Sequence, residues 1–198
     1  RAFMSEEAQY AYMATRQALE QANLTQEDID QREVGLLYGN DSTAKSTYEA
    51  VSKIYEYKST QACGSGAIFQ SMCSNTTQCL ATLFHLKGIN LTTSGACASG
   101  SHALGLAYLL IKDGLQDIII AGGAQEVNPE CMGSFDGIQA FSDRIDEPTK
   151  ASRPFDRDRN GLVPGGGGAT LIVESLDHAL ARGAQPIAEI IGWGFSGN

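Results

Sequence analysis

One cysteine stands where a strand, a tight corner and a helix are predicted to meet. Cys97 lies in residues 91–105 (LTTSGACASGSHALG), where its neighbours are small. The stretch 91–94 predicts a strand, Gly95 and Ala96 predict a corner, and a helix is expected to begin at the cysteine. Unpaired N–H groups at a helix start favour a thiolate, so we expect a nucleophile reached through a narrow tunnel. The alternative is a small buried apolar cysteine, but the lack of bulk around the sulfur favours the nucleophile.

No histidine is a convincing base for this cysteine. His102 follows it by five residues, and five helical residues turn the chain by about 500°, so the two side chains lie about 140° apart. His102 is therefore expected to be a packed or hydrogen-bonded residue. His85 and His178 are expected on polar helix surfaces without a partner. Three carboxylates follow the strand 117–121: Glu126, Glu130 and Asp136. Their spacing does not show that any two of them form a catalytic pair, and it fits structural roles at least as well.

Two other motifs resemble ligand loops only in part. Residues 165–168 (GGGG) lack the phosphate-loop pattern and lead into a strand, so they predict a glycine-lined turn pressed against a neighbouring element. Residues 156–161 (DRDRNG) start like a calcium loop, but glycine occupies position 167, where a bidentate glutamate is required. A local network of ion pairs and turns is predicted there instead.

Strands alternating with helices predict a mixed or parallel sheet covered by helices, in one domain over residues 1–198. The expected strands are 34–38, 91–94, 117–121, 169–174 and 187–194. The expected helices are 5–23, 42–59, two pieces within 68–87, 97–113, short turns within 129–141, and 176–182. Residues 143–159 predict a surface loop.

Composition limits the classes of function. The chain has 198 residues, 42% of them hydrophobic, and a formal net charge of −9, which disfavours nucleic-acid binding. No apolar run is long enough to cross a bilayer, and no secretory signal is recognised. The five cysteines, an odd number, fit a reducing cytoplasm, and their spacing fits no common zinc site, so we expect no metal.

Several segments together resemble the β-ketoacyl-acyl carrier protein synthases, most closely the type I enzymes of bacterial fatty-acid synthesis. They are residues 34–39 (VGLLYG), 94–100 (SGACASG), 117–123 (DIIIAGG), 151–161 (ASRPFDRDRNG) and 174–184 (ESLDHALARGA). The resemblance implies a thiolase-like α/β fold whose two halves each carry a mixed five-stranded sheet covered by helices. By that comparison this chain is the N-terminal half without its first strand, a fragment of a longer two-half enzyme.

The resemblance also implies an activity. Cys97 would take an acyl chain from a carrier-protein thioester, its backbone N–H would help to hold the oxyanion, and a decarboxylative Claisen condensation with malonyl-acyl carrier protein would give a 3-oxoacyl chain. Phe135 would line the acyl chamber, and Met72 would reach the chamber of a homodimer partner. No cofactor is implied beyond the 4'-phosphopantetheine that carries the substrates. The family's two catalytic histidines and its lysine lie in the second half, so we expect this chain alone to be inactive in condensation.

Two alternatives remain at this point. One is a ketosynthase of a polyketide or aryl-polyene pathway, with the same chemistry on another chain. The other is a non-catalytic partner subunit that sets chain length, which the retention of Cys97 disfavours because such subunits usually replace the nucleophile. Carrier proteins are acidic, so a basic docking patch is expected, with Arg1 as its remnant.

Overall fold

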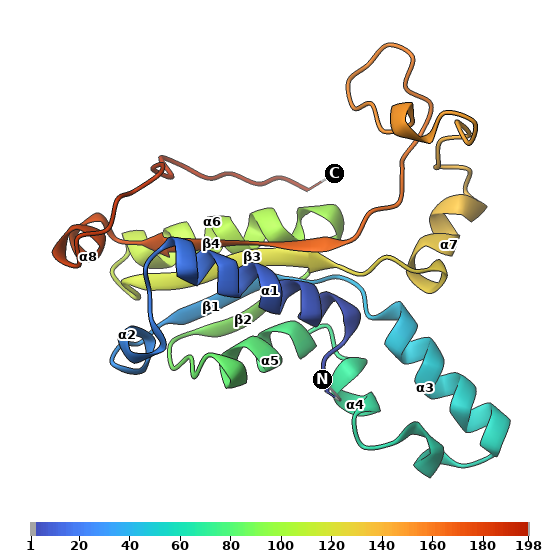
Figure 1. Ribbon diagram of the computed structural model, residues 1–198, viewed down its shortest axis with the longest axis horizontal. Coiled ribbons are helices and arrows are strands. Elements are labelled where there is room, and N and C mark those ends of the chain that lie inside the picture. Colours follow the sequence, from blue (N-terminus) through green and yellow to red (C-terminus); the bar gives the residue numbers. More distant parts are fainter. Residues whose placement is uncertain (1–2, 198) are drawn as a thin grey trace.

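The computed structural model describes residues 3–197 and contains one mixed sheet of four strands in the order β2-β1-β3-β4 (Figure 1). The strands are β1 (Gly35–Gly39), β2 (Asn90–Thr93), β3 (Ile118–Gln125) and β4 (Gly167–Glu174). β1 is parallel to both β2 and β3, whereas β4 runs antiparallel to β3. Four predicted strands are thereby confirmed, and the sheet has one strand fewer than the five of the fold that the sequence resembles.

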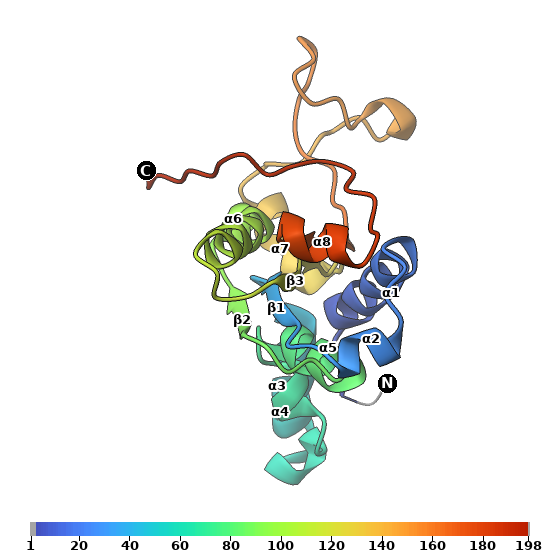
Figure 2. The same cartoon turned by 90° about the vertical axis from the view of Figure 1, so that its left-hand side faces the viewer.

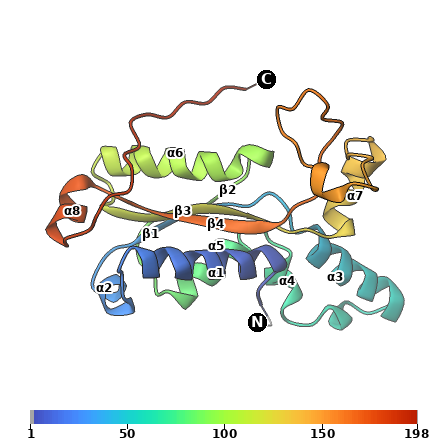
Figure 3. The ribbon, with the colours of Figure 1, turned by 45° about the horizontal axis from the view of Figure 1, so that its top comes forward.

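Helices cover both faces of this sheet (Figure 3). On one face lie α1 (Glu6–Gln21) and α5 (Asn75–Leu83), and on the other lies α6 (Ser99–Lys112). The remaining helices are α2 (Gln26–Asp30), α3 (Ala44–Tyr57), α4 (Ala67–Gln70), α7 (Pro129–Gly137) and α8 (Leu176–Ala181), with 3₁₀ turns at Thr60–Cys63, Ala96–Ala98 and Pro148–Lys150. The sequence did not predict α2, which is short and begins with a capping box formed by Thr25 and Asp28.

The core follows from strand alternation. In β3 the side chains of Ile118 and Ile120 face the cluster under α1 and α5, whereas Ile119 faces the cluster under α6. All three are at most 2% exposed, because a strand covered by helices on both faces buries every side chain. This continuous apolar run is the feature that made the strand predictable.

The predicted strand over residues 187–194 is wrong. That segment runs as an extended chain across the α6 side of the molecule, pairs with no strand among the described residues, and leaves Ile187 and Ile191 exposed (Figures 1 and 3). Trp193 anchors the segment, because its indole packs directly on Gly105 of α6. The pattern is apolar enough for a strand, but a strand also needs a hydrogen-bonding neighbour.

The two motifs that resembled ligand loops are structural. Gly166 packs against Val127, and Gly168 packs against the backbone of α1, as the glycine-turn prediction required. In the surface loop, Asp156 accepts a hydrogen bond from the N–H of Asp158 at 2.7 Å and pairs with Arg153 at 3.3 Å. This is the predicted local network. Within residues 3–197, no helix combines the length and apolarity that crossing a membrane requires.

Candidate active site

The corner that carries Cys97 has the predicted order of elements. β2 ends at Thr93, a single 3₁₀ turn spans Ala96–Ala98, and α6 begins at Ser99. Cys97 is exposed in that turn, two residues before the first residue of α6. The buried alternative is therefore excluded, and the sulfur faces solvent at the amino end of a 14-residue helix.

The backbone of this corner is unusual. Ala96 has φ 49°, in the left-handed region that a residue with a side chain adopts only at a cost of about 1 kcal/mol. Hydrogen bonds tie the surrounding turn together, including Ala98 N–H to the Gly95 carbonyl at 3.1 Å. Within the described residues, the N–H of Cys97 has no acceptor. A thiol and an unpaired N–H thus belong to the same residue.

Glycines let α6 approach the carboxyl end of the sheet. A Cβ on Gly39, the last residue of β1, would lie 2.4 Å from the backbone of Ser99 and Gly100. A Cβ on Gly123 would lie 3.1 Å from Gly100 Cα. The first turn of α6 therefore lies directly on two strand ends, and this contact sets the height of Cys97 above the sheet. The view from the opposite end of the sheet shows α6 on one side of the strands and α1 on the other (Figure 2).

A cleft of about 560 Å³ opens beside Cys97. Its walls come from the ends of β1 and β3, the start of β4 and the first turn of α6, and much of the lining is glycine backbone. The lining residues are Gly39, Asn40, Asp41, Ala96, Cys97, Ser99, Gly100, Gly123, Ala124, Gln125, Gly167, Gly168 and Ala169. The expected narrow tunnel is not present among the described residues, because exposed Cys97 lies in the wall of a cleft. Ligands commonly bind where parallel strands end in this way.

One polar pair lies at the edge of this cleft. The Ser94 hydroxyl donates a hydrogen bond to the carboxylate of Asp41, which joins the loop after β1 to the corner after β2. Asp41 lines the cleft itself, so an ionisable acidic side chain stands on the same wall as the sulfur.

The three histidines lie away from the sulfur, although two have partners that the sequence did not reveal. His102 packs its ring against Gly95, where a Cβ would lie 2.7 Å from Nδ1, so it is the packed residue that was expected. His85 Nδ1 lies 3.2 Å from Asp30, and His178 Nδ1 lies 2.8 Å from Glu174, which corrects the expectation that they lack partners. None of the three lines the cleft.

The two further residues carried over from the resemblance lie elsewhere. Phe135 lies in α7, is 38% exposed and stacks on Phe141 with ring centroids 6.3 Å apart. Met72 lies between α4 and α5, is 38% exposed, and its sulfur accepts a hydrogen bond from Gln78 at 3.6 Å. Neither side chain lines the Cys97 cleft in this chain, and their roles in an acyl chamber stay predictions.

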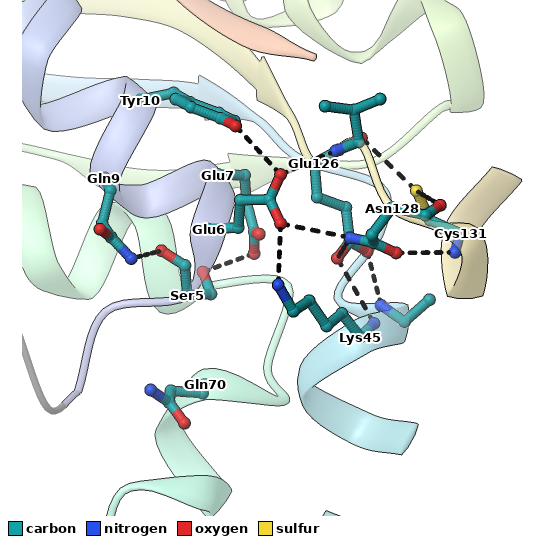
Figure 4. A network of polar contacts seen from close by, with 12 residues as sticks. Ser5, Glu6, Glu7, Gln9, Tyr10, Lys45, Gln70, Glu126, Asn128 and Cys131 are labelled. Carbon is teal, nitrogen blue, oxygen red and sulfur yellow. Dashed lines mark hydrogen bonds and ion pairs between the residues drawn. The ribbon is translucent and has the colours of Figure 1, made fainter. Parts of the chain in front are cut away.

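A buried carboxylate network supports the loop beside the cleft (Figure 4). Glu126, 1% exposed, accepts hydrogen bonds from the N–H of Ala44 at 2.6 Å and the side chain of Asn128 at 2.8 Å. Ser42 and the N–H of Lys45 donate to it as well, so this side chain caps the amino end of α3. The structural reading of Glu126 is thereby confirmed. The local sequence around Glu126 could not predict this capping role, because the helix that it caps begins about 80 residues earlier in the chain.

Glu7 extends this network to the cleft wall. Its side chain is fully buried, and Asn40, which lines the cleft, donates to it at 3.4 Å. Burial raises the pKa of Glu7, and the nearby Glu126 carboxylate raises it further. One Glu7 oxygen, Oε2, has no hydrogen-bond partner within the described residues.

The chain matches known proteins along most of its length. The family model "Beta-ketoacyl synthase, N-terminal domain" matches residues 1–179. The 3-oxoacyl-[acyl-carrier-protein] synthase 1 of Haemophilus influenzae is 41% identical over 194 residues, which are 97% of this chain and 48% of that protein. The chain therefore spans about half the length of the curated relatives that it matches.

Solved structures agree. A beta-ketoacyl synthase from Burkholderia phymatum superimposes with a TM-score of 0.85 at 38% identity, over 93% of this chain and 45% of that one. A second solved structure is a ketosynthase in complex with its type II polyketide acyl-carrier protein and bound to the hexaketide. It superimposes with a TM-score of 0.82 at 30% identity, over 92% of this chain and 47% of that one. The fold is therefore the amino-terminal half of a thiolase-like ketosynthase.

Proposed function

Because the chain belongs to the β-ketoacyl synthase family, we propose that Cys97 accepts an acyl chain from the thioester of an acyl carrier protein. The observation that carries the proposal is the exposed thiol at the start of α6 with an unpaired N–H on the same residue. The pathway is fatty-acid chain elongation, which the 41% identity to a 3-oxoacyl-[acyl-carrier-protein] synthase supports.

The first step is a transfer between two sulfur atoms. The thiolate of Cys97 attacks the thioester carbonyl, the bond from carbon to Sγ forms, and the bond from carbon to the pantetheine sulfur breaks. The pantetheine thiolate leaves and takes up a proton from solvent, which balances the proton lost from Cys97. While the tetrahedral intermediate exists, its oxyanion accepts a hydrogen bond from the Cys97 N–H.

The second step extends the chain. A carbanion formed by loss of carbon dioxide from a malonyl thioester attacks the carbonyl carbon of the acyl group on Cys97. The new carbon–carbon bond forms, the bond from carbon to Sγ breaks, and Cys97 leaves as a thiolate, so the product is a 3-oxoacyl thioester two carbons longer. By resemblance, the histidines and the lysine for this step belong to the second half of the family fold. We therefore expect acyl transfer to Cys97 in this chain alone, but no condensation.

We also propose that the protein works in the cytoplasm as a homodimer. The support for a dimer is β2, which is an edge strand of the sheet among the described residues, so its outer edge is available to a second strand. The odd number of cysteines supports the cytoplasm. A dimer would also give exposed Met72 the role of reaching the partner's chamber. The acyl carrier protein needs a basic docking surface, and Arg1, expected to mark it, lies outside the described residues.

A polyketide or aryl-polyene ketosynthase is the second candidate, favoured by the 30% identity to the polyketide ketosynthase. Its chemistry at Cys97 is the same, so the carrier protein distinguishes the two candidates. Faster loading from a fatty-acid carrier protein than from a polyketide carrier protein supports the first, and the reverse order supports the second. A non-catalytic chain-length subunit would take no acyl group from either.

The experiment compares two exposed cysteines of this chain. After incubation with acyl-acyl carrier protein, intact-mass measurement is expected to show one acyl group on the unmodified chain and none on Cys97→Ser. Cys73→Ser is the matched control and is expected to gain one acyl group, like the unmodified chain. Cys73 is also an exposed residue, but partial desolvation of its thiol and the nearby carboxylate of Asp41 raise the pKa of that thiol. Equal acylation of Cys97→Ser and the unmodified chain would refute the proposal.

A further inference from the structure

Ser99 lies directly behind the corner that carries Cys97. Its side chain is 5% exposed, and its hydroxyl makes two hydrogen bonds. It accepts from the N–H of Gly95 at 2.9 Å and donates to the carbonyl of Ala96 at 2.6 Å. The N–H of Ser99 also donates to that carbonyl, so both donors of one buried residue hold the same oxygen.

The carbonyl of Ala96 belongs to the same peptide unit as the N–H of Cys97. A trans peptide is planar, and its C=O and N–H point in opposite directions. Because Ser99 holds the carbonyl toward the buried first turn of α6, the Cys97 N–H must point outward. This agrees with its lack of any acceptor among the described residues and with the presence of Cys97 in the cleft wall.

One further contact, together with the bond from Gly95, makes Ser99 a fixed support. The hydroxyl of Thr93 donates to the carbonyl of Ser99 at 2.8 Å, which joins the end of β2 to the start of α6. The bond from the Gly95 N–H holds the Ser94–Gly95 peptide, which lies one residue before Ala96, the residue with φ 49°. A backbone conformation of this kind persists only where its surroundings hold it, and here the hydroxyl of Ser99 does so.

We propose that Ser99 is the positioning residue of the oxyanion donor: its hydroxyl orients the Ala96–Cys97 peptide so that the Cys97 N–H points at the developing oxyanion. A carbonyl that accepts a hydrogen bond also makes the N–H of the same peptide a stronger donor. Ser99 touches neither the sulfur nor the acyl group. The inference rests on the proposed acyl transfer to Cys97.

The test separates a reaction that forms an oxyanion from one that does not. Acyl transfer from the hexanoyl thioester of N-acetylcysteamine places negative charge on the carbonyl oxygen. Alkylation by iodoacetamide displaces iodide at a saturated carbon and places none there. For Ser99→Ala we expect acylation of Cys97 to slow about tenfold, with the alkylation rate and its pH profile within about twofold of the unmodified chain.

Matched variants complete the design. Ser99→Thr keeps a hydroxyl and is expected to restore acylation, whereas Ser99→Val has the shape of threonine without the hydroxyl and is expected to behave like Ser99→Ala. Ser101→Ala, at an exposed position two residues further on in α6, is the control that changes neither reaction. Circular dichroism and the unfolding midpoint confirm the fold of each variant.

Each other outcome has a definite meaning. If Ser99→Ala acylates at the normal rate, or if both reactions slow together, Ser99 does not position the oxyanion donor. Loss of folding in both hydroxyl-free variants would assign Ser99 a purely structural role and overturn the inference in the same way. If the unmodified chain gains no acyl group at Cys97 while iodoacetamide still alkylates it, the proposed function fails and takes this inference with it.

Discussion

At the carboxyl ends of β1 and β3 the chain packs backbone against backbone, whereas at the opposite end of the sheet it packs charged side chains against one another. Gly39 and Gly123 bring α6 onto the first end and leave a cleft of about 560 Å³. At the second end, Glu174 lies 2.8 Å from His178 and also pairs with Arg182, which donates to the carbonyl of Ala22 at 2.8 Å. The depression there is smaller, about 210 Å³.

The difference shows where reactivity and where stability reside in this sheet. At the cleft end the Cys97 N–H has no partner among the described residues and the thiol is exposed, so both are available to a substrate. At the other end the carboxylate of Glu174 accepts hydrogen bonds from Arg182 and is in hydrogen-bond contact with His178, and Arg182 holds α8 against α1 and β4. Variants at the two ends should therefore separate activity from stability.

The largest effect is expected for Gly39→Ala. The new Cβ would lie 2.4 Å from the backbone of Ser99 and Gly100, so α6 must move, and we expect a loss of about 3 kcal/mol in the free energy of unfolding together with slower acylation of Cys97. Urea unfolding measures the loss of stability, and the rate of acyl transfer to Cys97 measures the loss of activity.

Gly114→Ala, beyond the other end of α6, is the control. A Cβ on Gly114 would lie in open space, and the cost comes only from its φ of 71°, so the variant should lose about 1 kcal/mol of stability and acylate at the normal rate. Similar behaviour of both variants would remove the distinction between the ends.

Glu174→Gln should lower the free energy of unfolding by about 2 kcal/mol and leave acylation of Cys97 intact. The reason is that Arg182, whose side chain is only 13% exposed, keeps its positive charge and loses the carboxylate that pairs with it.

The stability that Glu174 contributes should depend on pH. Burial pushes the pKa of Glu174 upward, but hydrogen bonds from Arg182 and His178 outweigh this effect and hold the pKa below 4.5. The native state then binds the proton more weakly than the unfolded state. The stabilisation is therefore complete well above pH 4.5 and is lost as the pH falls through the lowered pKa.

Unfolding curves from pH 7 to pH 3 measure this difference. The unmodified chain should lose stability more steeply below about pH 4.5 than Glu174→Gln. An equal slope in both proteins, or slower acylation in the variant, would show that the two ends are not separable.

Glu126→Gln should cost about 1–2 kcal/mol, because an amide NH₂ would replace an oxygen that faces donors on Lys45 and Asn128. The damage should be local, since this carboxylate caps α3. Hydrogen exchange is expected to speed up in the first turn of α3 and to stay unchanged in α6. Uniformly faster exchange in both helices would instead mean that Glu126 supports the whole sheet.

The smallest effect is expected for Glu7→Gln, of the order of 1 kcal/mol. The raised pKa means that the native state holds this proton more tightly, so the contribution of Glu7 is present below pH 4.5 and is lost as the pH rises through the raised pKa. The variant should therefore become more stable relative to the unmodified chain as the pH rises above 4.5. A relative stability that does not change with pH would show that Glu7 titrates as it does in the unfolded chain.

Local patterns predicted the elements that depend on local physics. The run Ile118 to Ile120 is apolar throughout because both faces of β3 are covered. The small residues around Cys97 predicted the corner, where a Cβ on Gly95 would lie 2.7 Å from the His102 ring. Where an outcome depended on a distant partner, the sequence was silent or misleading. Residues 187–194 have the composition of a strand, but no neighbour among residues 3–197 pairs with them.

The site shows the same division. The position of Cys97 was readable, but its supports were not, because Glu126 acts on a helix start about 80 residues away and His178 bonds a carboxylate on the preceding strand. Ser99 was visible only as one more small residue. Its two hydrogen bonds depend on the left-handed conformation of Ala96, which an alanine does not signal.

The most direct test locates the acyl group among five thiols. The chain is incubated with a limiting amount of acyl-acyl carrier protein, digested without reducing agent, and each cysteine peptide is measured for acyl mass. The account predicts the label on the Cys97 peptide and none on the peptides of Cys63, Cys73, Cys79 and Cys131. A label spread over several cysteines in proportion to their exposure, or a Cys97 peptide without acyl mass, would contradict it.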